Sequence, residues 1–135
     1  MKRNPEIFRA ILLQVEALSI GHSLDSIPIG HSIKSIKWDG EEGEDVIAEH
    51  VRLLKEAGYI DALISEGMND IGVKQVTSYS INRLLNDGHD FLANAKNESV
   101  WKQARTLIQE KGGDVSLAVL KALLAKVAMQ QFGLS

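Results

Sequence analysis

Apolar and polar positions between residues 44 and 64 follow two different periods. Five residues recur at three- and four-residue steps and so share one face of a predicted helix: Ile47, His50, Val51, Leu54 and Ala57. The charged residues fall on the opposite face: Asp45, Glu49, Arg52, Lys55 and Glu56. Gly58 can take the left-handed conformation that ends a helix, and the β-branched character of residues 59–64 predicts a strand directly after it. This order of helix, glycine and strand is typical of a winged helix-turn-helix domain.

Two further features precede this helix. A first helix is expected to begin at Pro5, because Asn4 is a good N-cap and a proline in the first turn needs no N–H donor. The helical pattern is lost from residue 20 to 40, where five apolar residues indicate one or two short strands: Ile27, Ile29, Ile33, Ile36 and Trp38. The acidic segment 39–45 stands where a helix-turn-helix has its first short helix, and it can form at most an abbreviated turn.

The chain after the first strand predicts a wing and a return strand. Residues 65–77 are polar and contain glycine, which suits the tip of a wing, and residues 78–85 return toward the core. Asn86 is expected to cap the next helix. Three residues of that helix are expected to pack inward: His89, Phe91 and Leu92.

Two more helices are predicted at the C-terminal end. Asn97 begins the first, Gly112 and Gly113 end it, and either Asp114 or Ser116 caps the second. The second helix has an apolar face broader than an ordinary core stripe. Five of its residues form a candidate surface for a homodimer or for another protein partner: Val119, Leu123, Val127, Met129 and Phe132. The alternative is that this helix packs within the chain, between the first helix and the helix that contains Trp101.

Together these elements predict an α+β fold, namely a winged helix-turn-helix domain with additional C-terminal helices. Residues 1–96 are expected to form the winged-helix core, and residues 97–135 a helical extension packed on it. A chain of 135 residues is long enough for one domain with a substantial core.

The composition is that of an ordinary globular protein, with 44% hydrophobic and 24% charged residues. No apolar stretch approaches the roughly 20 residues that a membrane helix needs, so no membrane contact is expected. The N-terminal residues lack the pattern of a secretory signal, and a cytoplasmic location is the expectation. The sequence has no cysteine, which excludes disulfides, thiolate nucleophiles and thiolate metal sites.

Four stretches of the chain, taken together, resemble one family. They are MKRNPEIFRAILLQVE at residues 1–16, HVRLLKEAGYI at 50–60, GHDFLANA at 88–95, and VWKQA, EKGG and LAVLKALLAKVA between 100 and 128. This combination resembles the uncharacterised bacterial and phage family called domain of unknown function 2513, over nearly the whole chain. The resemblance implies a winged-helix fold with added C-terminal helices and supplies no established reaction or ligand. Similar chains carry threonine and tryptophan before the GHxFL run, where Leu85 and Asn86 stand here.

The charge of the predicted recognition helix argues against DNA. From Asp39 to Glu49 the chain has six acidic residues and no lysine or arginine, and this segment would repel phosphates. Acids near a helix N-terminus also interact favourably with the macrodipole, by about 0.3–1 kcal/mol each, which explains Glu44 and Asp45 without a function. Six scattered basic residues are the candidates for DNA contact: Lys34, Lys37, Arg52, Lys55, Lys74 and Arg83.

The sequence indicates no catalytic, metal or cofactor site. Its four histidines have neither HxxxH nor HExxH spacing: His22, His31, His50 and His89. His50 and His89 fall at core-facing positions, where a neutral imidazole with one backbone partner is the usual outcome. The acidic segment lacks the order of a calcium loop, and no GxSxG or phosphate-binding glycine loop occurs. We therefore expect no cofactor and no enzymatic activity.

Two functions from different classes remain. The first is a regulatory or protein-interaction module of bacterial or phage origin. The second is a DNA-binding transcriptional regulator that contacts duplex through helix 44–57 and wing 65–77. The acidic helix face and the broad apolar face of the last helix favour the first function, whereas the fold itself favours the second.

Overall fold

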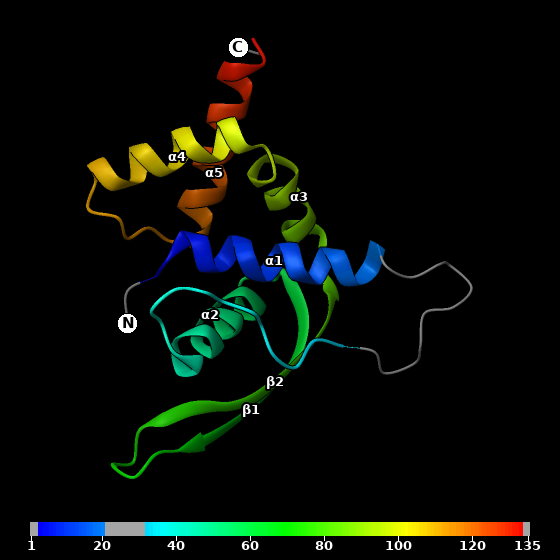
Figure 1. The fold of residues 1–135 in the computed structure, drawn as a ribbon, viewed down its shortest axis with the longest axis vertical. Coiled ribbons are helices and arrows are strands. Elements are labelled where there is room, and N and C mark those ends of the chain that lie inside the picture. Colours follow the sequence, from blue (N-terminus) through cyan, green and yellow to red (C-terminus); the bar gives the residue numbers. More distant parts are fainter. Residues whose placement is uncertain (1–2, 21–31, 134–135) are drawn as a thin grey trace.

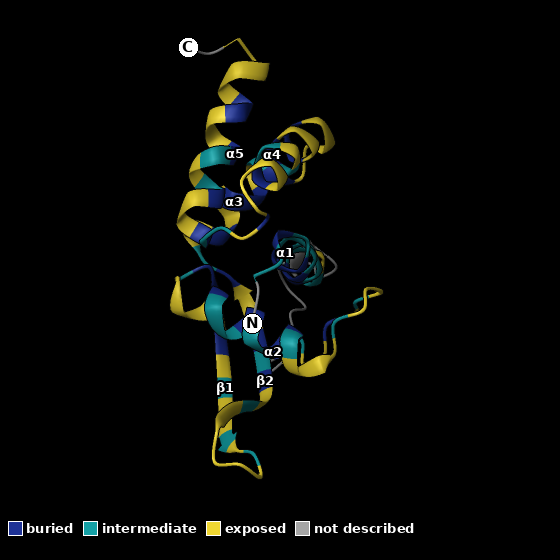
Figure 2. Ribbon diagram, turned by 90° about the vertical axis from the view of Figure 1, so that its left-hand side faces the viewer, coloured by how far each residue is buried: buried dark blue, intermediate teal, exposed yellow. Residues whose placement is uncertain are grey.

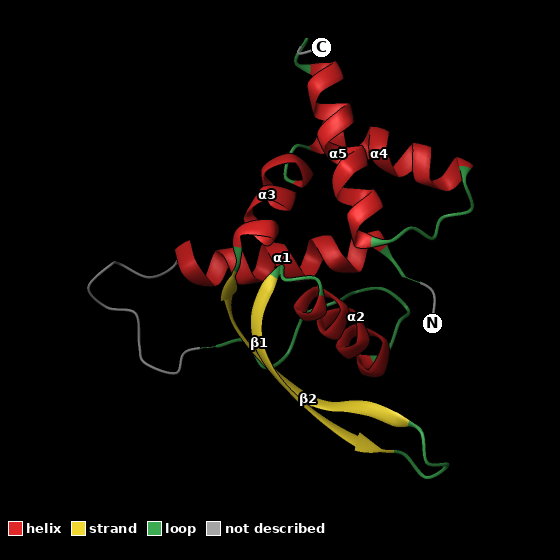
Figure 3. Ribbon diagram, turned by 180° about the vertical axis from the view of Figure 1, so that it is seen from behind, coloured by secondary structure: helices red, strands yellow, loops and turns green. Residues whose placement is uncertain are grey.

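The computed structural model describes residues 3–20 and 32–133. Within them lie seven elements: α1 (Pro5–Ile20), α2 (Glu44–Glu56), β1 (Ile60–Met68), β2 (Lys74–Leu84), α3 (Asn86–Ala95), α4 (Glu98–Glu110) and α5 (Leu117–Gln131). The described part of the chain is therefore α+β, with helices and one two-stranded antiparallel sheet (Figure 3). The α+β class predicted from the sequence is confirmed.

Helix α1 crosses the middle of the molecule and divides the other elements into two groups (Figure 1). Helix α2 and the β1–β2 hairpin lie on one side of α1, and α3, α4 and α5 lie on the other. Buried side chains from all five of these helices and from both strands form one hydrophobic cluster. No helix of the described residues is long and apolar enough to cross a membrane.

The start of α1 agrees with the sequence prediction. Asn4 caps the helix, because its Oδ1 accepts a hydrogen bond of 3.0 Å from the backbone N–H of Glu6. The inward face of the helix is fully buried: Ile7, Phe8, Ile11, Leu12 and Val15. This helix supplies the central layer against which both groups of elements pack.

The segment between α1 and α2 is held mainly by hydrogen bonds to its neighbours. Ile33 forms an isolated antiparallel bridge with Ile81 of β2, through backbone hydrogen bonds of 2.9 and 2.8 Å. The backbone N–H of Ile36 donates to the Tyr79 hydroxyl at 3.0 Å. The predicted short strands are thus reduced to one bridge among the described residues, and Ile27 and Ile29 lie outside them. Residues 39–43 form no helix.

Helix α2 buries the face that its apolar period predicts. Ile47, Ala48, His50, Val51 and Leu54 are its buried residues. Ala57 was expected on this face, but it follows the helix as its C-cap and is exposed. The predicted glycine stop is confirmed: Gly58 has φ +81°, its N–H donates to the Lys55 carbonyl, and the next N–H donates to the Leu54 carbonyl.

The hairpin is longer than predicted, and its turn is shorter. β1 and β2 pair from Ile60 with Leu84 to Met68 with Lys74, so most of the predicted wing tip 65–77 is paired strand. The sequence does not predict these strand segments, because most residues in the far half of the hairpin are exposed and only Gly67 and Val76 are half-buried, which leaves no apolar alternation (Figure 2). Only residues 69–73 form the turn. The Asn69 side chain fixes that turn by accepting hydrogen bonds from the N–H groups of Ile71 and Val73, at 3.0 and 2.9 Å.

Helix α3 differs from its prediction in two ways. It begins at Asn86, with Leu85 rather than Asn86 at the N-cap position and no side-chain cap. His89 is exposed, whereas Gly88, Phe91, Leu92 and Ala95 are buried. The reason is Gly88: a Cβ there would lie 2.2 Å from the Tyr59 carbonyl oxygen, so this helix packs its glycine against the backbone that joins α2 to β1 and turns His89 outward.

The boundaries of α4 and α5 were predicted well. The Asn97 side chain accepts from the N–H of Val100 at 3.1 Å, and the Ser116 hydroxyl accepts from the N–H of Val119 at 3.2 Å. Ser116 is thus the cap of α5, out of the two residues that the sequence allowed. The glycine stop after α4 is confirmed by positive φ angles of +98° and +86° at Gly112 and Gly113. Helix α5 packs against α3 and α4.

Candidate functional site

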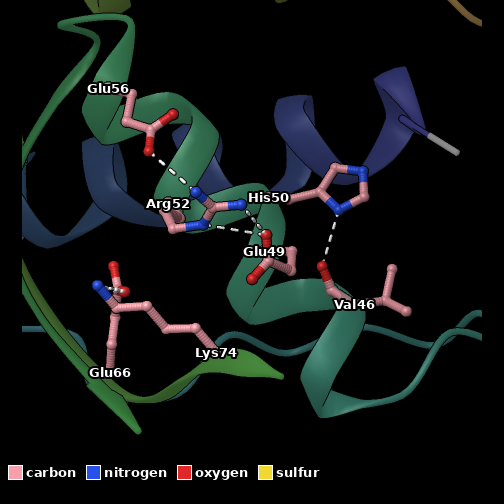
Figure 4. A network of polar contacts seen from close by, with 7 residues as sticks. All are labelled: Val46, Glu49, His50, Arg52, Glu56, Glu66 and Lys74. Carbon is pink, nitrogen blue, oxygen red and sulfur yellow. Dashed lines mark hydrogen bonds and ion pairs between the residues drawn. The ribbon is translucent and has the colours of Figure 1, made fainter. Parts of the chain in front are cut away.

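One side of α2 and the adjoining hairpin form a continuous charged surface. Asp45, Glu49, Arg52 and Glu56 are three or four residues apart and so share one stripe of α2. Glu66 of β1 and Lys74 of β2 face this stripe from the hairpin (Figure 4). We call these six residues the α2–hairpin face. It contains the positions that would approach DNA in a winged-helix protein.

Arg52 at the centre of this face is paired with carboxylates of its own helix. Its Nε donates to Glu49 Oε2 at 3.0 Å, its Nη2 donates to the same oxygen, and its Nη1 donates to Glu56 Oε1 at 3.0 Å (Figure 4). The hydrogen bond to Glu49 and the negative charges of Glu49, Glu56 and Glu66 raise the pKa of Arg52. The guanidinium therefore stays positively charged, and its charge is balanced by carboxylates of the same helix.

Lys74 on the hairpin is paired in the same way, since its Nζ lies 3.1 Å from Glu66 Oε2. The other four basic residues predicted to contact DNA are exposed: Lys34, Lys37, Lys55 and Arg83. None of these four takes part in an ion pair within the part of the chain that the structure describes. The structure thus brings Arg52 and Lys74 onto one face, where acidic residues interrupt the basic surface they would form.

A groove of about 310 Å³ runs between α2 and β2 within this region. Its wall on α2 consists of Asp45, Val46, Glu49 and Arg52, and its wall on the hairpin consists of Val73, Lys74, Gln75 and Val76. Val46 and Val76 are half-buried, and Val73 is 53% exposed. The groove therefore combines apolar side chains on both walls with acidic groups on the helix.

The hairpin turn presents large apolar side chains to solvent, a feature that the sequence prediction missed. Ile71 is 84% exposed and Met68 is 74% exposed, and Val73 continues this surface toward the groove. We call these three residues the hairpin tip. The available signal was an isoleucine between Asp70 and Gly72, because a turn of that composition has no interior in which to bury it. Exposed apolar clusters of this kind mark interaction surfaces.

The opposite face of α2 contains a buried histidine that serves the fold. His50 is fully buried, as predicted, and its ring centroid lies 4.8 Å from that of Phe8. Its Nε2 accepts from the backbone N–H of Asn4 at 2.9 Å, and its Nδ1 lies 2.8 Å from the Val46 carbonyl oxygen. These partners define a neutral tautomer with the proton on Nδ1. Burial is the main reason that the pKa of His50 is lowered.

Part of the acidic segment also has a structural role. Glu42 accepts hydrogen bonds from the Trp38 indole N–H at 2.9 Å and from the Asn4 side-chain amide at 2.7 Å. These two hydrogen bonds are the largest causes of the lowered pKa of Glu42. This carboxylate therefore ties residues 38–42 to the start of α1. Within the described residues, no group of three or more histidine, aspartate or glutamate side chains could hold a metal ion.

The candidate partner surface on α5 is smaller than the sequence indicated. Val127 is only 1% exposed and belongs to the core, which corrects its assignment to this surface. It lies three residues after the buried Leu124, on the face that packs against α3 and α4. Leu123 is half-buried, whereas Val119, Met129 and Phe132 are exposed. Whether this reduced surface forms a homodimer stays a prediction.

Comparison with known proteins places the chain in a family. No solved structure matches it. A protein of Haemophilus influenzae described as "Uncharacterized protein" is 31% identical over 133 residues, which cover 96% of this chain and 98% of that relative. The family described as "Hypothetical protein (DUF2513)" matches residues 2–114. The chain therefore belongs to this DUF2513 family, as its sequence resemblance implied.

Proposed function

We propose that this protein is a non-enzymatic protein-interaction module of winged-helix type with a regulatory role. The order of its elements supports this architecture: α1, the bridge at Ile33, α2 and the β1–β2 hairpin follow one another as helix, strand, recognition helix and wing. The first helix of the helix-turn-helix is replaced by residues 39–43. The proposed contact surface is the α2–hairpin face together with the hairpin tip.

The pairing of Arg52 is the observation that carries this proposal. A phosphate that approached α2 would have to displace Glu49 and Glu56 from the guanidinium while remaining close to both carboxylates. Binding to DNA depends on basic side chains that replace the counterions of the phosphates. The positive charge of Arg52 is already balanced by Glu49 and Glu56. The same face therefore disfavours nucleic acid and remains accessible to a protein.

The hairpin tip supports a protein partner for a separate reason. Burying an apolar side chain in an interface contributes roughly 25 cal/mol per Å² removed from water. Ile71, Met68 and Val73 are exposed in the free protein, so each has surface to bury. Phosphates and the sugar backbone offer little apolar surface to match them.

Site-specific photo-crosslinking tests this proposal directly. A photoreactive residue is introduced at Ile71, and a matched control carries it at Thr106, an exposed position on α4. In bacterial cells, the variant at position 71 is expected to form discrete protein adducts that the control lacks and that persist after nuclease treatment. Adducts to nucleic acid from position 71, or the same adducts from both positions, would contradict the proposal.

DNA binding remains a second candidate because of the unpaired basic residues. Lys34, Lys37 and Arg83 are exposed, with no ion pair within the described residues. A regulator that used them beside helix 44–57 and the hairpin would bind random duplex in a salt-dependent way at about 50 mM salt. The variant Lys34→Ala/Lys37→Ala/Arg83→Ala would then lose that binding.

A further inference from the structure

We infer that the groove between α2 and β2 binds a basic amphipathic helix of a partner protein. This inference rests on the proposed function and specifies the chemistry of the partner. The groove has apolar side chains on both walls, with Val46 on the helix and Val73 and Val76 on the hairpin. An amphipathic helix can lay its apolar side against such residues, which is a common mode of peptide recognition.

The charge around the groove determines the sign of the charge that the partner must carry. Asp45 and Glu49 lie in the groove wall, and Glu56 on α2 and Glu66 on the hairpin lie beside it, where they form ion pairs with groove residues. The two basic residues in the groove, Arg52 and Lys74, are each paired with one or more of these acids. The region thus has an excess of negative charge, which is complementary to lysine and arginine side chains.

The hairpin tip extends the apolar surface of the groove. Val73 belongs both to the groove wall and to the hairpin tip, so the two surfaces meet at this residue. Asn69 holds the turn in a fixed conformation, so Ile71 is presented in place before a partner binds.

A synthetic peptide provides a defined probe of this inference. The probe is a fluorescein-labelled peptide of about 14 residues, with leucine on one helical face and lysine on the other. One control peptide has glutamate in place of every lysine, and a second has the lysine peptide's composition in scrambled order. Fluorescence anisotropy at about 50 mM salt is expected to show binding of the amphipathic lysine peptide at least about tenfold tighter than either control.

Variants of the protein locate the binding site. Asp45→Asn/Glu49→Gln removes two acids from the groove and is expected to weaken binding of the lysine peptide about tenfold. Asp90→Asn/Glu110→Gln makes the same charge change at exposed positions outside the groove and should leave binding unchanged. For the apolar contact, Val73→Ser is expected to weaken binding severalfold, whereas Leu63→Ser, at an exposed position of β1 that does not line the groove, should not.

Each remaining outcome overturns the inference. Equal binding of the amphipathic and scrambled peptides would mean that charge alone attracts them. Binding that survives Asp45→Asn/Glu49→Gln would place the peptide elsewhere. If the lysine peptide does not bind while the photoreactive variant at position 71 still forms protein adducts in cells, the proposed interaction function stands and only the basic helical partner is rejected. If neither peptide binding nor protein adducts are observed, the proposed function is rejected as well.

Discussion

The two faces of α2 differ in what their side chains contact, although they belong to one 13-residue helix. On the inner face, Val51 and Leu54 are fully buried, and both nitrogens of His50 are engaged with backbone groups. On the outer face, charged side chains of α2 pair with one another, Lys74 and Glu66 pair within the adjoining hairpin, and all of them remain partly exposed. The inner face therefore specifies the fold, and the outer face is available for function.

This difference explains why the order of helix, hairpin and core does not by itself predict DNA binding. The inner face is constrained by packing, so any sequence that keeps its apolar period can form the helix. The outer face is free to change charge at little cost in stability, because exposed ion pairs contribute only about 0–1 kcal/mol. In this chain the outer face is dominated by carboxylates, and its apolar surface lies at the end of the hairpin.

The largest expected effect comes from a cavity on the inner face. Leu54→Ala removes a fully buried side chain and should lower the free energy of unfolding by about 2–5 kcal/mol. The neighbouring exposed substitution Lys55→Ala is the matched control and should change it by less than about 0.5 kcal/mol. Urea denaturation followed by circular dichroism measures both. Equal effects of the two substitutions would refute the division of α2 into two faces.

The buried histidine gives the inner face a pH dependence. His50→Gln is expected to cost about 1–3 kcal/mol at pH 7, because it disturbs two buried hydrogen-bonded groups. The pKa of His50 is lowered in the folded state, so the unfolded chain takes up a proton that the folded protein resists. The wild type should therefore lose stability as the pH falls below about 6.5, the ordinary pKa of histidine.

The comparison between wild type and variant isolates this effect. The stability difference between the wild type and His50→Gln should narrow as the pH falls from 7 toward about 5, because only the wild type loses the contribution of neutral His50. The lowered pKa of Glu42 produces a separate loss at lower pH, below about 4.3. If the difference in stability between the wild type and His50→Gln stays constant between pH 7 and about 5, His50 is not buried as a neutral group.

Removing carboxylates from the α2–hairpin face should change DNA binding more than it changes the free energy of unfolding. Glu49→Gln/Glu56→Gln/Glu66→Gln releases Arg52 and Lys74 from their partners. Each lost surface ion pair is worth at most about 1 kcal/mol. The triple variant should nevertheless acquire salt-dependent binding to random duplex DNA at about 50 mM salt, measured by anisotropy. If its DNA binding equals that of the wild type, these carboxylates are not what disfavours DNA.

The smallest effect on stability is expected at the hairpin tip. Ile71→Ser should change the free energy of unfolding by less than about 0.5 kcal/mol, because this side chain is already exposed to solvent. The same substitution should reduce the yield of protein adducts in cells when the photoreactive residue is placed at the neighbouring Val73. A large loss of stability would instead assign Ile71 a structural role.

The parts of the fold that depend on local signals could be predicted from the sequence. The period of α2, the stop at Gly58 and the caps at Asn4, Asn97 and Ser116 each follow from residues close together in the chain. The errors arise where distant segments decide the outcome. His89 was expected inside, but the close approach of the Tyr59 carbonyl requires Gly88 at that position.

The candidate site was less predictable than the fold. The charged stripe of α2 was visible in the sequence, whereas the pairing of Lys74 with Glu66 depends on the strand register that brings them together. The hairpin tip is not evident from the sequence, because the polar composition of residues 65–77 predicts a wing tip, whereas 65–68 and 74–77 are strand and the turn exposes Ile71. Val127 was misassigned because the broad apolar face of α5 does not itself show which side packs on α3 and α4.

We propose that the α2–hairpin face binds protein rather than nucleic acid, and titration of the wild-type protein into labelled random duplex DNA distinguishes the two. Proteins that bind DNA non-specifically have dissociation constants of roughly 10⁻⁴–10⁻⁶ M at physiological salt. We expect no change in the anisotropy of the DNA at about 50 mM salt with up to about 100 μM protein. Salt-dependent binding in that range, abolished by Arg52→Ala/Lys74→Ala, would contradict this proposal.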